Sequence, residues 1–252
     1  MTIETDVLLV GAGPIGIELA VAFKARGIRY VHLEADQIGS TIAWYAPQTH
    51  FFSSPERIAI AGVPLQTLDQ TKATREEYLT YLRAVVLQFD LRIETFERVV
   101  SLQKRDDWFE ATTVRAAGQR HWRARNVVLA IGDMHRPRRI GVPGEDLPHV
   151  SHYFGDPHHY FRRRVLIVGG QNSAVEAAIR CYRVGAAVTL SYRGRELDAN
   201  RIKFWLLPEI RSLIRDGRLT FLPLTTVREI RGDAVVLDPH GEVEADAVLL
   251  LT

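Results

Sequence analysis

The sequence is poor in cysteine and lysine, and neither sign of charge prevails. Cys181 is the only cysteine among 252 residues, which excludes an internal disulfide, whether structural or redox-active. Arginine supplies almost all of the basic charge. The formal net charge of +2 is too small to indicate a nucleic acid or a membrane lipid as partner.

Long hydrophobic runs are also missing. No apolar stretch approaches the roughly 20 residues that span a bilayer. The acidic N-terminus, MTIETD, leads directly into a predicted strand instead of a signal peptide. We therefore expect a cytoplasmic protein. With 46% hydrophobic residues in a chain of 252, it can bury one large core or two modest ones.

A glycine-rich turn follows the first predicted strand, residues 7–10, which is short, apolar and partly β-branched. Gly11, Gly13 and Gly16 form the pattern G-x-G-x-x-G at the start of a helix. The first glycine allows the tight turn, the second lets backbone approach a pyrophosphate, and the third allows helix and strand to pack closely. Glu34 lies at the tip of the next predicted strand, residues 30–33, where it can accept hydrogen bonds from a ribose diol. The stretch predicts a dinucleotide site.

The same pattern recurs in the second half of the chain. A predicted strand at 165–168 leads into the turn GGQNSA, and a further predicted strand at 188–191 is followed by Tyr192, Arg193 and Arg195. A site for NAD favours a carboxylate at this tip for the ribose 2′-OH, whereas a site for NADP favours arginine for the 2′-phosphate. We therefore expect NADPH here. The alternative is a pair of solvated surface arginines in an arginine-rich protein.

The two motifs predict an α/β fold class: two Rossmann-like dinucleotide-binding domains, each a parallel sheet with helices and a three-stranded β-meander. We expect an FAD-binding domain at 1–140, a proline-rich connection at 141–163 and an NAD(P)-binding domain at 164–252. The histidines around the connection match no metal-ligand spacing, so no metal site is predicted; they are His149, His152, His158 and His159.

Hydrophobic periodicity predicts the remaining elements. For the first domain we expect, in order, a loop-rich stretch at 35–69, a helix at 74–89 that starts with a Thr74–Glu77 capping box, a strand at 91–94, a meander of strands at 99–102, 108–114 and 122–123, and a separate buried strand at 127–131. For the second domain we expect a helix at 206–215, a strand at 219–222, a meander at 227–230, 234–237 and 243–244, and a final strand at 247–251.

Aromatic and hydroxyl side chains after Glu34 are suited to line a flat ring system beside a bound dinucleotide. The alternative is that these aromatic side chains pack a long loop against the hydrophobic core. Our candidates for FAD binding are Gly11, Gly13, Pro14, Ile15, Gly16, Glu34, Ala35, Trp44, Phe52, Ser53, Val99, Ala130 and Gly132. Our candidates for NADPH binding are Gly169, Gly170, Gln171, Asn172, Ser173, Tyr192, Arg193 and Arg195. We assign no catalytic residue.

An acid at one ribose and arginines at the other indicate an enzyme that carries FAD and takes hydride from NADPH. Several stretches also carry a resemblance to a known family: GAGPIG (11–16), THFFSSPERIAIAGVP (49–64), ATREEYLTYLR (73–83), VPGEDLPHVSHYF (142–154), GGQNSAVEAA (169–178), YRG (192–194) and IKFWLLPE (202–209). Over essentially its whole length the chain resembles the flavoprotein reductases related to thioredoxin reductase, and most closely the YpdA-type bacillithiol disulfide reductases. The resemblance implies FAD at the first motif, NADPH at the second with the YRG arginine near the 2′-phosphate, and a homodimer or higher homo-oligomer.

The chain departs from that family in two ways. Many members have cysteine where this chain has Ile15, and thioredoxin reductases proper use a C-x-x-C in the second domain, which this chain does not contain. We expect Cys181 to be an inert core thiol. Electrons would then pass from flavin to a disulfide, small-molecule or protein acceptor without a redox-active cysteine of the chain's own. In the family the last strand leads back into the FAD domain, so we expect a C-terminally truncated chain.

Two other functions stay open at this point. A flavin-dependent monooxygenase also pairs two such domains, although residues 144–153 lack the full F-x-G-x-x-x-H spacing of that family. A non-catalytic NADP-binding fragment would retain affinity for NADPH without binding flavin.

Overall fold

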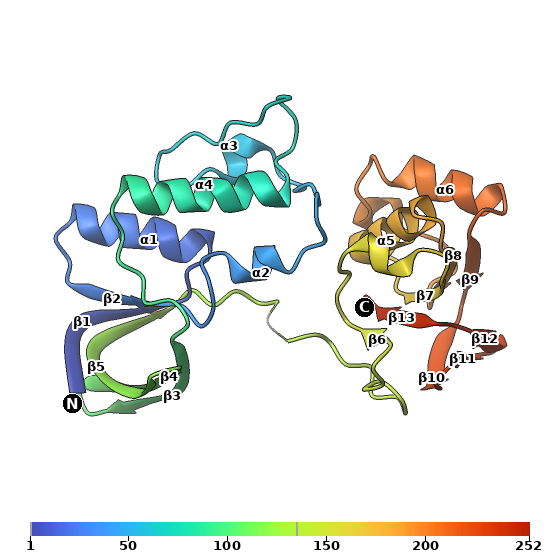
Figure 1. Cartoon of the computed structure of the whole chain (residues 1–252). Coiled ribbons are helices and arrows are strands. Elements are labelled where there is room, and N and C mark those ends of the chain that lie inside the picture. The colour runs from blue at the N-terminus through green and yellow to red at the C-terminus, as the bar shows by residue number, and fades with distance from the viewer. Residues whose placement is uncertain (1, 135) are drawn as a thin grey trace. The chain divides into compact units, whose positions relative to one another are not determined.

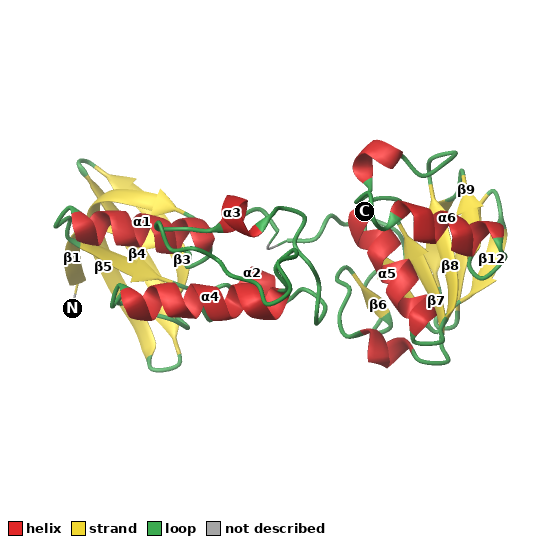
Figure 2. Cartoon of the chain, turned by 90° about the horizontal axis from the view of Figure 1, so that it is seen from above, coloured by secondary structure: helices red, strands yellow, loops and turns green. Residues whose placement is uncertain are grey.

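The computed structural model of the chain describes residues 2–134 and 136–252, and it divides into two compact units after residue 135. In each unit helices cover one face of a sheet (Figures 1 and 2). The predicted α/β class with two Rossmann-like units is confirmed. Within the described residues, none of the helices combines the length and the apolar character needed to cross a membrane.

The first unit is built on a mixed sheet with the strand order β2-β1-β5-β4-β3. Its strands are β1 (Thr2–Val10), β2 (Tyr30–Leu33), β3 (Arg98–Arg105), β4 (Trp108–Arg115) and β5 (Gly118–Leu129). Its helices are α1 (Pro14–Ala25), α2 (Ser40–Ala43), α3 (Pro55–Ile58) and α4 (Arg75–Gln88). The stretch 35–69, predicted to be loop-rich, holds the short helices α2 and α3.

Two predictions about the strands of this unit are wrong. The strands expected at 122–123 and 127–131 are one strand, β5, which pairs antiparallel with β4 through its first half and parallel with β1 along nearly its whole length. One strand serves both neighbours because β5 presents one backbone edge to β4 and the opposite edge to β1. The strand expected at 91–94 is not formed; Glu94 alone makes a parallel bridge to Leu33.

The second unit has a parallel sheet and a separate antiparallel meander. The parallel sheet has the order β6-β13-β7-β8-β9, made of β6 (Val150–Ser151), β7 (Arg164–Val168), β8 (Ala187–Tyr192), β9 (Thr220–Pro223) and β13 (Ala247–Leu250). The meander consists of β10 (Thr226–Ile230), β11 (Ala234–Asp238) and β12 (Gly241–Glu244). The helices are α5 (Asn172–Arg183) and α6 (Leu207–Arg215), with 3-10 turns at Pro157–Tyr160 and Ala199–Arg201.

Neighbouring residues of the central strands bury their side chains on opposite faces, as the strand period of two requires. In the first unit Leu9 belongs to the cluster under helices α1 and α4, whereas Leu8 belongs to the cluster with Trp122 of β5. In the second unit Ile167 packs with α5 and α6, whereas Leu166 packs with Val235 of the meander. The central strands are therefore buried on both faces, which explains why they are apolar runs.

Most of the segment 141–163, which we predicted to be a connection, packs within the second unit. Strand β6 pairs with β13, and Val142, Leu147 and Val150 pack against the cluster under the meander. The buried carboxylate of Glu145 accepts the N–H groups of Ile140 and Gly141. Burial by itself would raise the pKa of Glu145, but these hydrogen bonds and the nearby Arg139 and His152 outweigh it and lower the pKa. The prolines of this segment led us to predict a connection instead of a packed part of the second unit.

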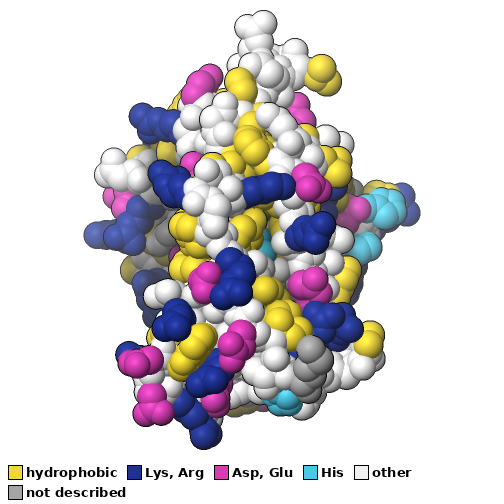
Figure 3. Space-filling view, turned by 90° about the vertical axis from the view of Figure 1, so that its left-hand side faces the viewer, with side chains coloured by type: hydrophobic (Ala, Val, Ile, Leu, Met, Phe, Trp, Pro, Cys, Tyr) yellow, Lys and Arg dark blue, Asp and Glu magenta, His cyan; other side chains and the backbone are white. Residues whose placement is uncertain are grey.

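Basic and acidic side chains are interspersed over the face of the first unit that Figure 3 shows. Several of the unit's charges form exposed pairs, among them Arg29 with Asp6, Arg123 with Glu4 and Lys24 with Asp90. Exposed pairs of this kind contribute about 0–1 kcal/mol each to stability. They keep the charge locally balanced, in line with the small net charge.

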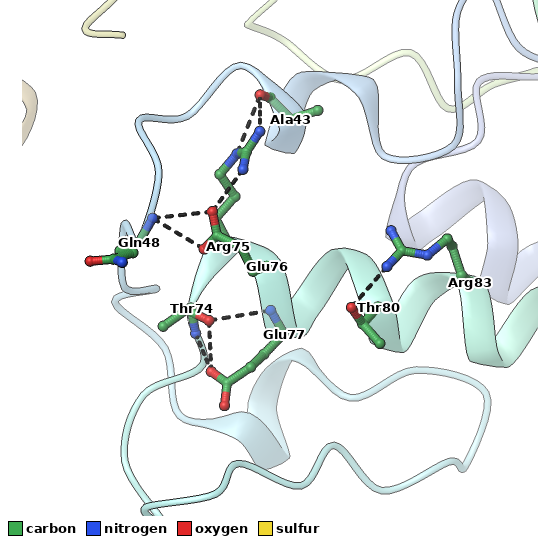
Figure 4. Close-up of polar contacts among 8 residues, drawn as sticks. All are labelled: Ala43, Gln48, Thr74, Arg75, Glu76, Glu77, Thr80 and Arg83. Atoms are coloured by element: carbon green, nitrogen blue, oxygen red, sulfur yellow. Dashed lines mark hydrogen bonds and ion pairs between the residues drawn. The ribbon is translucent and has the colours of Figure 1, made fainter. Parts of the chain in front are cut away.

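The N-terminus of α4 carries the predicted capping box (Figure 4). The hydroxyl oxygen of Thr74 accepts the N–H of Glu77 at 3.2 Å, and the carboxylate of Glu77 accepts the N–H of Thr74 at 2.7 Å. Two N–H groups that no helical carbonyl can reach are thereby satisfied.

Replacing Thr74 by alanine should lower the free energy of unfolding by about 1 kcal/mol, because the cap is lost. Urea denaturation measures the change. Thr80→Ala is the matched control, since Thr80 lies on the exposed side of the same helix and its hydroxyl accepts only from Arg83 among the described residues. Equal losses in the two variants would contradict a stabilising role for the cap.

Candidate dinucleotide-binding sites

The first glycine turn lies at the carboxyl edge of the first sheet, between β1 and α1. Gly11 has φ +103°, and a Cβ on it would lie 2.4 Å from the carbonyl oxygen of Ala130. A Cβ on Gly16 would lie 2.0 Å from the carbonyl oxygen of Gly11. Both positions therefore require glycine for the fold itself. By contrast, apart from the adjoining residues of the chain, no described atom lies within 4 Å of the position that a Cβ would take on Gly13.

Helix α1 begins at Pro14 with Gly13 as N-cap, and no side chain among the described residues caps it. The N–H groups of its first turn and the positive end of the helix dipole are available to an anion. Together with the open space at Gly13, this arrangement fits the pyrophosphate of a dinucleotide. Ile15, in the first turn of the helix, is 69% exposed.

Glu34 has a second role that the sequence did not reveal. Its buried carboxylate accepts the N–H of Ala12 at 2.7 Å and the N–H of Asp36 at 2.9 Å, so it ties the glycine turn to the end of β2. Oε1 also accepts from the Ser40 hydroxyl at 3.5 Å, whereas Oε2 keeps a second lone pair that can accept from a ribose hydroxyl. Binding of a ribose at Glu34 is therefore compatible with this structural role.

His32 also supports the first turn, and no sequence signal pointed to it. Its Nε2 lies 2.8 Å from the carbonyl oxygen of Gly11, and its ring is buried. Burial lowers the pKa of His32, so the ring is neutral at pH 7. Because a carbonyl can only accept, Nε2 carries the proton and donates to Gly11.

The other candidates of the first unit lie on segments that leave this turn. The N–H of Gly39 donates to the carbonyl of Ala12 at 3.0 Å, so α2 starts beside the turn; Trp44 ends that helix. The N–H of Ala130 donates to Val10 at 2.7 Å at the end of β5. Ala35 directly follows Glu34, Gly132 follows β5 with φ +65°, and Val99 on β3 packs in the cluster of Leu8. Phe52 and Ser53 lie on the segment that precedes α3.

The second glycine turn repeats the geometry of the first. Gly169 has φ +147°, and a Cβ on it would lie 2.3 Å from the carbonyl oxygen of Leu251. A Cβ on Gly170 or on Gly194 would lie 2.4 Å from the ring of Tyr192. The Tyr192 ring thus packs against both glycines and joins the glycine turn to the turn after β8.

The N-terminus of α5 follows this turn, with Gln171 as N-cap and no capping side chain among the described residues. The carbonyl oxygen of the Asn172 side chain accepts the N–H of Lys203 at 2.6 Å, which holds the 202–205 segment at the start of the helix. The buried ammonium of Lys203 pairs with Glu176 at 3.0 Å. Ser173 is exposed in the first turn of the helix. No sequence pattern indicated the contacts of Lys203.

Arg193 and Arg195 are exposed on the turn that follows β8. Among the described residues, no carboxylate lies within ion-pair distance of either guanidinium. Both are therefore available to an anion from solvent.

The thiol of Cys181 lies within the core of the second unit, under helix α5. Burial raises its pKa to about 12, so the thiol stays protonated near neutral pH and is not a nucleophile in this environment.

Comparisons with known proteins agree with this geometry. A family model described as pyridine nucleotide-disulphide oxidoreductase matches residues 8–251. The chain is 35% identical over 242 residues to Bacilliredoxin reductase Bdr of Bacillus subtilis (strain 168). The aligned region covers 96% of this chain and 73% of that protein. It is 30% identical over 198 residues to a ferredoxin--NADP reductase of Ignicoccus hospitalis, covering 77% of this chain and 58% of that protein.

Among solved structures, Bacillithiol Disulfide Reductase Bdr (YpdA) from Bacillus cereus is 34% identical and superposes with a TM-score of 0.94, over 99% of this chain and 78% of that chain. The resemblance to the YpdA-type reductases is thereby confirmed. The protein is an enzyme, a flavin-dependent oxidoreductase that uses a nicotinamide cofactor and delivers electrons to an acceptor. The chain belongs to the pyridine nucleotide-disulphide oxidoreductase family.

Proposed function

We propose that the protein is an FAD-dependent NADPH oxidoreductase, with FAD at the first glycine turn and NADPH at the second. The observation that carries the proposal is the contrast between two strand tips. Strand β2 leads into the buried carboxylate of Glu34, whereas β8 leads into the exposed Arg193 and Arg195. A carboxylate suits ribose hydroxyls, and arginine suits a 2′-phosphate.

In the first unit, the N-terminus of α1 and the space beside Gly13 would hold the pyrophosphate of FAD, and Glu34 would hold its ribose. When bound, the flavin supplies the two-electron transfer between nicotinamide and acceptor. The chain's part is to bind and orient it. We keep the remaining candidates of this unit as proposed contacts: Pro14, Ile15, Ala35, Trp44, Phe52, Ser53, Val99, Ala130 and Gly132.

In the second unit, the N-terminus of α5 would hold the pyrophosphate of NADPH, next to the closely packed Gly170. Arg193 and Arg195 would bind the 2′-phosphate, because a guanidinium presents a fork of N–H donors that matches phosphate oxygens. NADH has no phosphate at the ribose 2′ position, so it would gain no ion pair from these two arginines.

The acceptor would be reduced without a redox-active cysteine from this chain. Ile15 cannot attack a disulfide, and the Cys181 thiol is buried. The names of the relatives favour a disulfide acceptor of the bacillithiol or bacilliredoxin class. Reduction of a disulfide to two thiols takes two electrons and two protons. NADPH supplies both electrons and one proton, and solvent supplies the other proton.

The direct test is the visible absorption spectrum of the purified protein before and after anaerobic addition of NADPH. We expect flavin bands that bleach with NADPH, followed by reoxidation on addition of a disulfide such as oxidised bacillithiol. A protein that stays colourless after incubation with FAD would contradict the proposal, as would flavin bands that NADPH leaves unchanged.

Gly13→Ala separates the needs of the cofactor from those of the fold. The added methyl meets no described atom within 4 Å, so the melting temperature of the apoprotein should not change. It would fill space that the pyrophosphate needs, so the affinity for FAD should fall about tenfold. Gly232→Ala, where a Cβ also has open space, is the control and should keep both properties. Unchanged FAD affinity in Gly13→Ala would place the flavin elsewhere.

Arg193→Ala combined with Arg195→Ala tests the choice of nicotinamide cofactor. Loss of two charge-assisted contacts should weaken NADPH binding about 10- to 100-fold, while NADH binding changes by less than about threefold. Equilibrium titration of the full chain measures both affinities. The control is Arg228→Ala, which removes an exposed arginine of β10 that pairs with Asp238. Equal weakening of both cofactors would contradict our assignment of these arginines.

A further inference from the structure

The turn that carries Arg193 is fixed by two residues that follow β9. The N–H of Leu224 donates to the carbonyl of Gly194 at 3.1 Å, and the N–H of Thr225 donates to the carbonyl of Tyr192 at 3.1 Å. These bonds hold the backbone on both sides of Arg193. The place where its side chain leaves the turn is therefore set by residues about thirty positions further along the chain.

The hydroxyl of Thr225 anchors this arrangement in the core. Thr225 is buried, and its Oγ1 donates to the carbonyl of Leu222 at 2.8 Å. The Oγ of Ser191 lies 2.8 Å from Thr225 Oγ1. Since the Thr225 proton goes to Leu222, the Ser191 hydroxyl is the donor in this pair.

Ser191 connects the anchor to the glycine turn. It is completely buried near the end of β8, and its carbonyl accepts the N–H of Gly169 at 3.0 Å. A chain of hydrogen bonds thus runs from Gly169 through Ser191 and Thr225 to Tyr192. It links the proposed pyrophosphate site to the turn with the two arginines.

Leu224 adopts an unusual backbone conformation at this point. Its φ is +56°, in the left-handed region that non-glycine residues seldom adopt, and its side chain is 57% exposed. The exposed side chain gains little from burial there. Residues of this kind persist where the surrounding structure fixes them, often next to a functional site. Here the conformation accompanies the two N–H bonds that Leu224 and Thr225 donate to the arginine turn.

We propose that Thr225 is a positioning residue for recognition of the 2′-phosphate of NADPH. Its hydroxyl holds the turn at residues 192–195 in one conformation, so that Arg193 and Arg195 present their charges without first ordering the backbone. This inference rests on the NADPH site proposed above. It adds a residue whose hydroxyl bonds to Leu222 and Ser191, outside the arginine turn itself.

Thr225→Val tests the inference, because valine has the same shape without the hydroxyl. Isothermal titration of the full chain with NADP⁺ and with NAD⁺ measures both affinities independently of activity. We expect NADP⁺ binding to weaken about fivefold, the worth of one hydrogen bond, while NAD⁺ binding changes by less than about twofold. Thr225→Ser keeps the hydroxyl and should restore NADP⁺ affinity.

A second variant separates positioning from stability. Thr225→Val leaves the buried Ser191 hydroxyl without its acceptor and removes the donor to the Leu222 carbonyl, which lowers the melting temperature. Ser191→Ala combined with Thr225→Val removes the unpaired Ser191 hydroxyl and should recover part of the melting temperature, while NADP⁺ binding stays weak. The control is Thr113→Val, a buried threonine of the first unit that bonds to Glu97 and Trp122. It should lower stability without altering the ratio of NADP⁺ to NAD⁺ affinity.

Equal weakening of NADP⁺ and NAD⁺ in Thr225→Val would overturn the inference, as would an unchanged NADP⁺ affinity. In either case the proposed NADPH site itself still stands, provided that the wild type prefers NADP⁺ and that the double arginine variant loses this preference. If the wild type shows no preference, the proposed cofactor choice fails, and this inference fails with it.

Discussion

The close approach of a glycine to a neighbouring carbonyl oxygen sets the geometry of both units. A Cβ on Gly11 would lie 2.4 Å from the oxygen of Ala130, and one on Gly169 would lie 2.3 Å from the oxygen of Leu251. Only glycine tolerates these contacts and the positive φ that accompanies them. Because the chain can turn this tightly, each following helix starts at the carboxyl edge of its sheet. Both helix N-termini thereby become available to phosphate.

Features that depend on residue type within a short stretch could be predicted from the sequence. The glycine turns, the capping box at Thr74 and the apolar runs of the central strands all satisfy local steric or hydrogen-bonding needs. Pairing partners could not be predicted in this way. The residue types of β5 do not indicate that one strand pairs with two neighbours, and the prolines of 141–163 led us to predict a connection where Val150 packs in the core.

The candidate sites divide along the same line. Glu34, Arg193 and Arg195 stand at strand tips, where the motif itself gives a role to the residue type. The contacts of His32 with Gly11 and of Asn172 with Lys203 join residues about twenty to thirty positions apart, at no characteristic spacing. Such contacts need three-dimensional structure to be found. They show that each glycine turn is supported by residues distant from it in the sequence.

The continuous strand β5 has a consequence for the cooperativity of the first unit. Strand β5 bonds to β1 on one edge and to β4 on the other. The antiparallel pair β4–β5 therefore cannot open fully without weakening the sheet that holds the glycine turn. In the second unit the meander forms a sheet of its own, joined to the parallel sheet by side-chain packing. Amide protons of β4 should therefore exchange with the global opening of their unit, whereas those of β12 can exchange through a smaller, local opening.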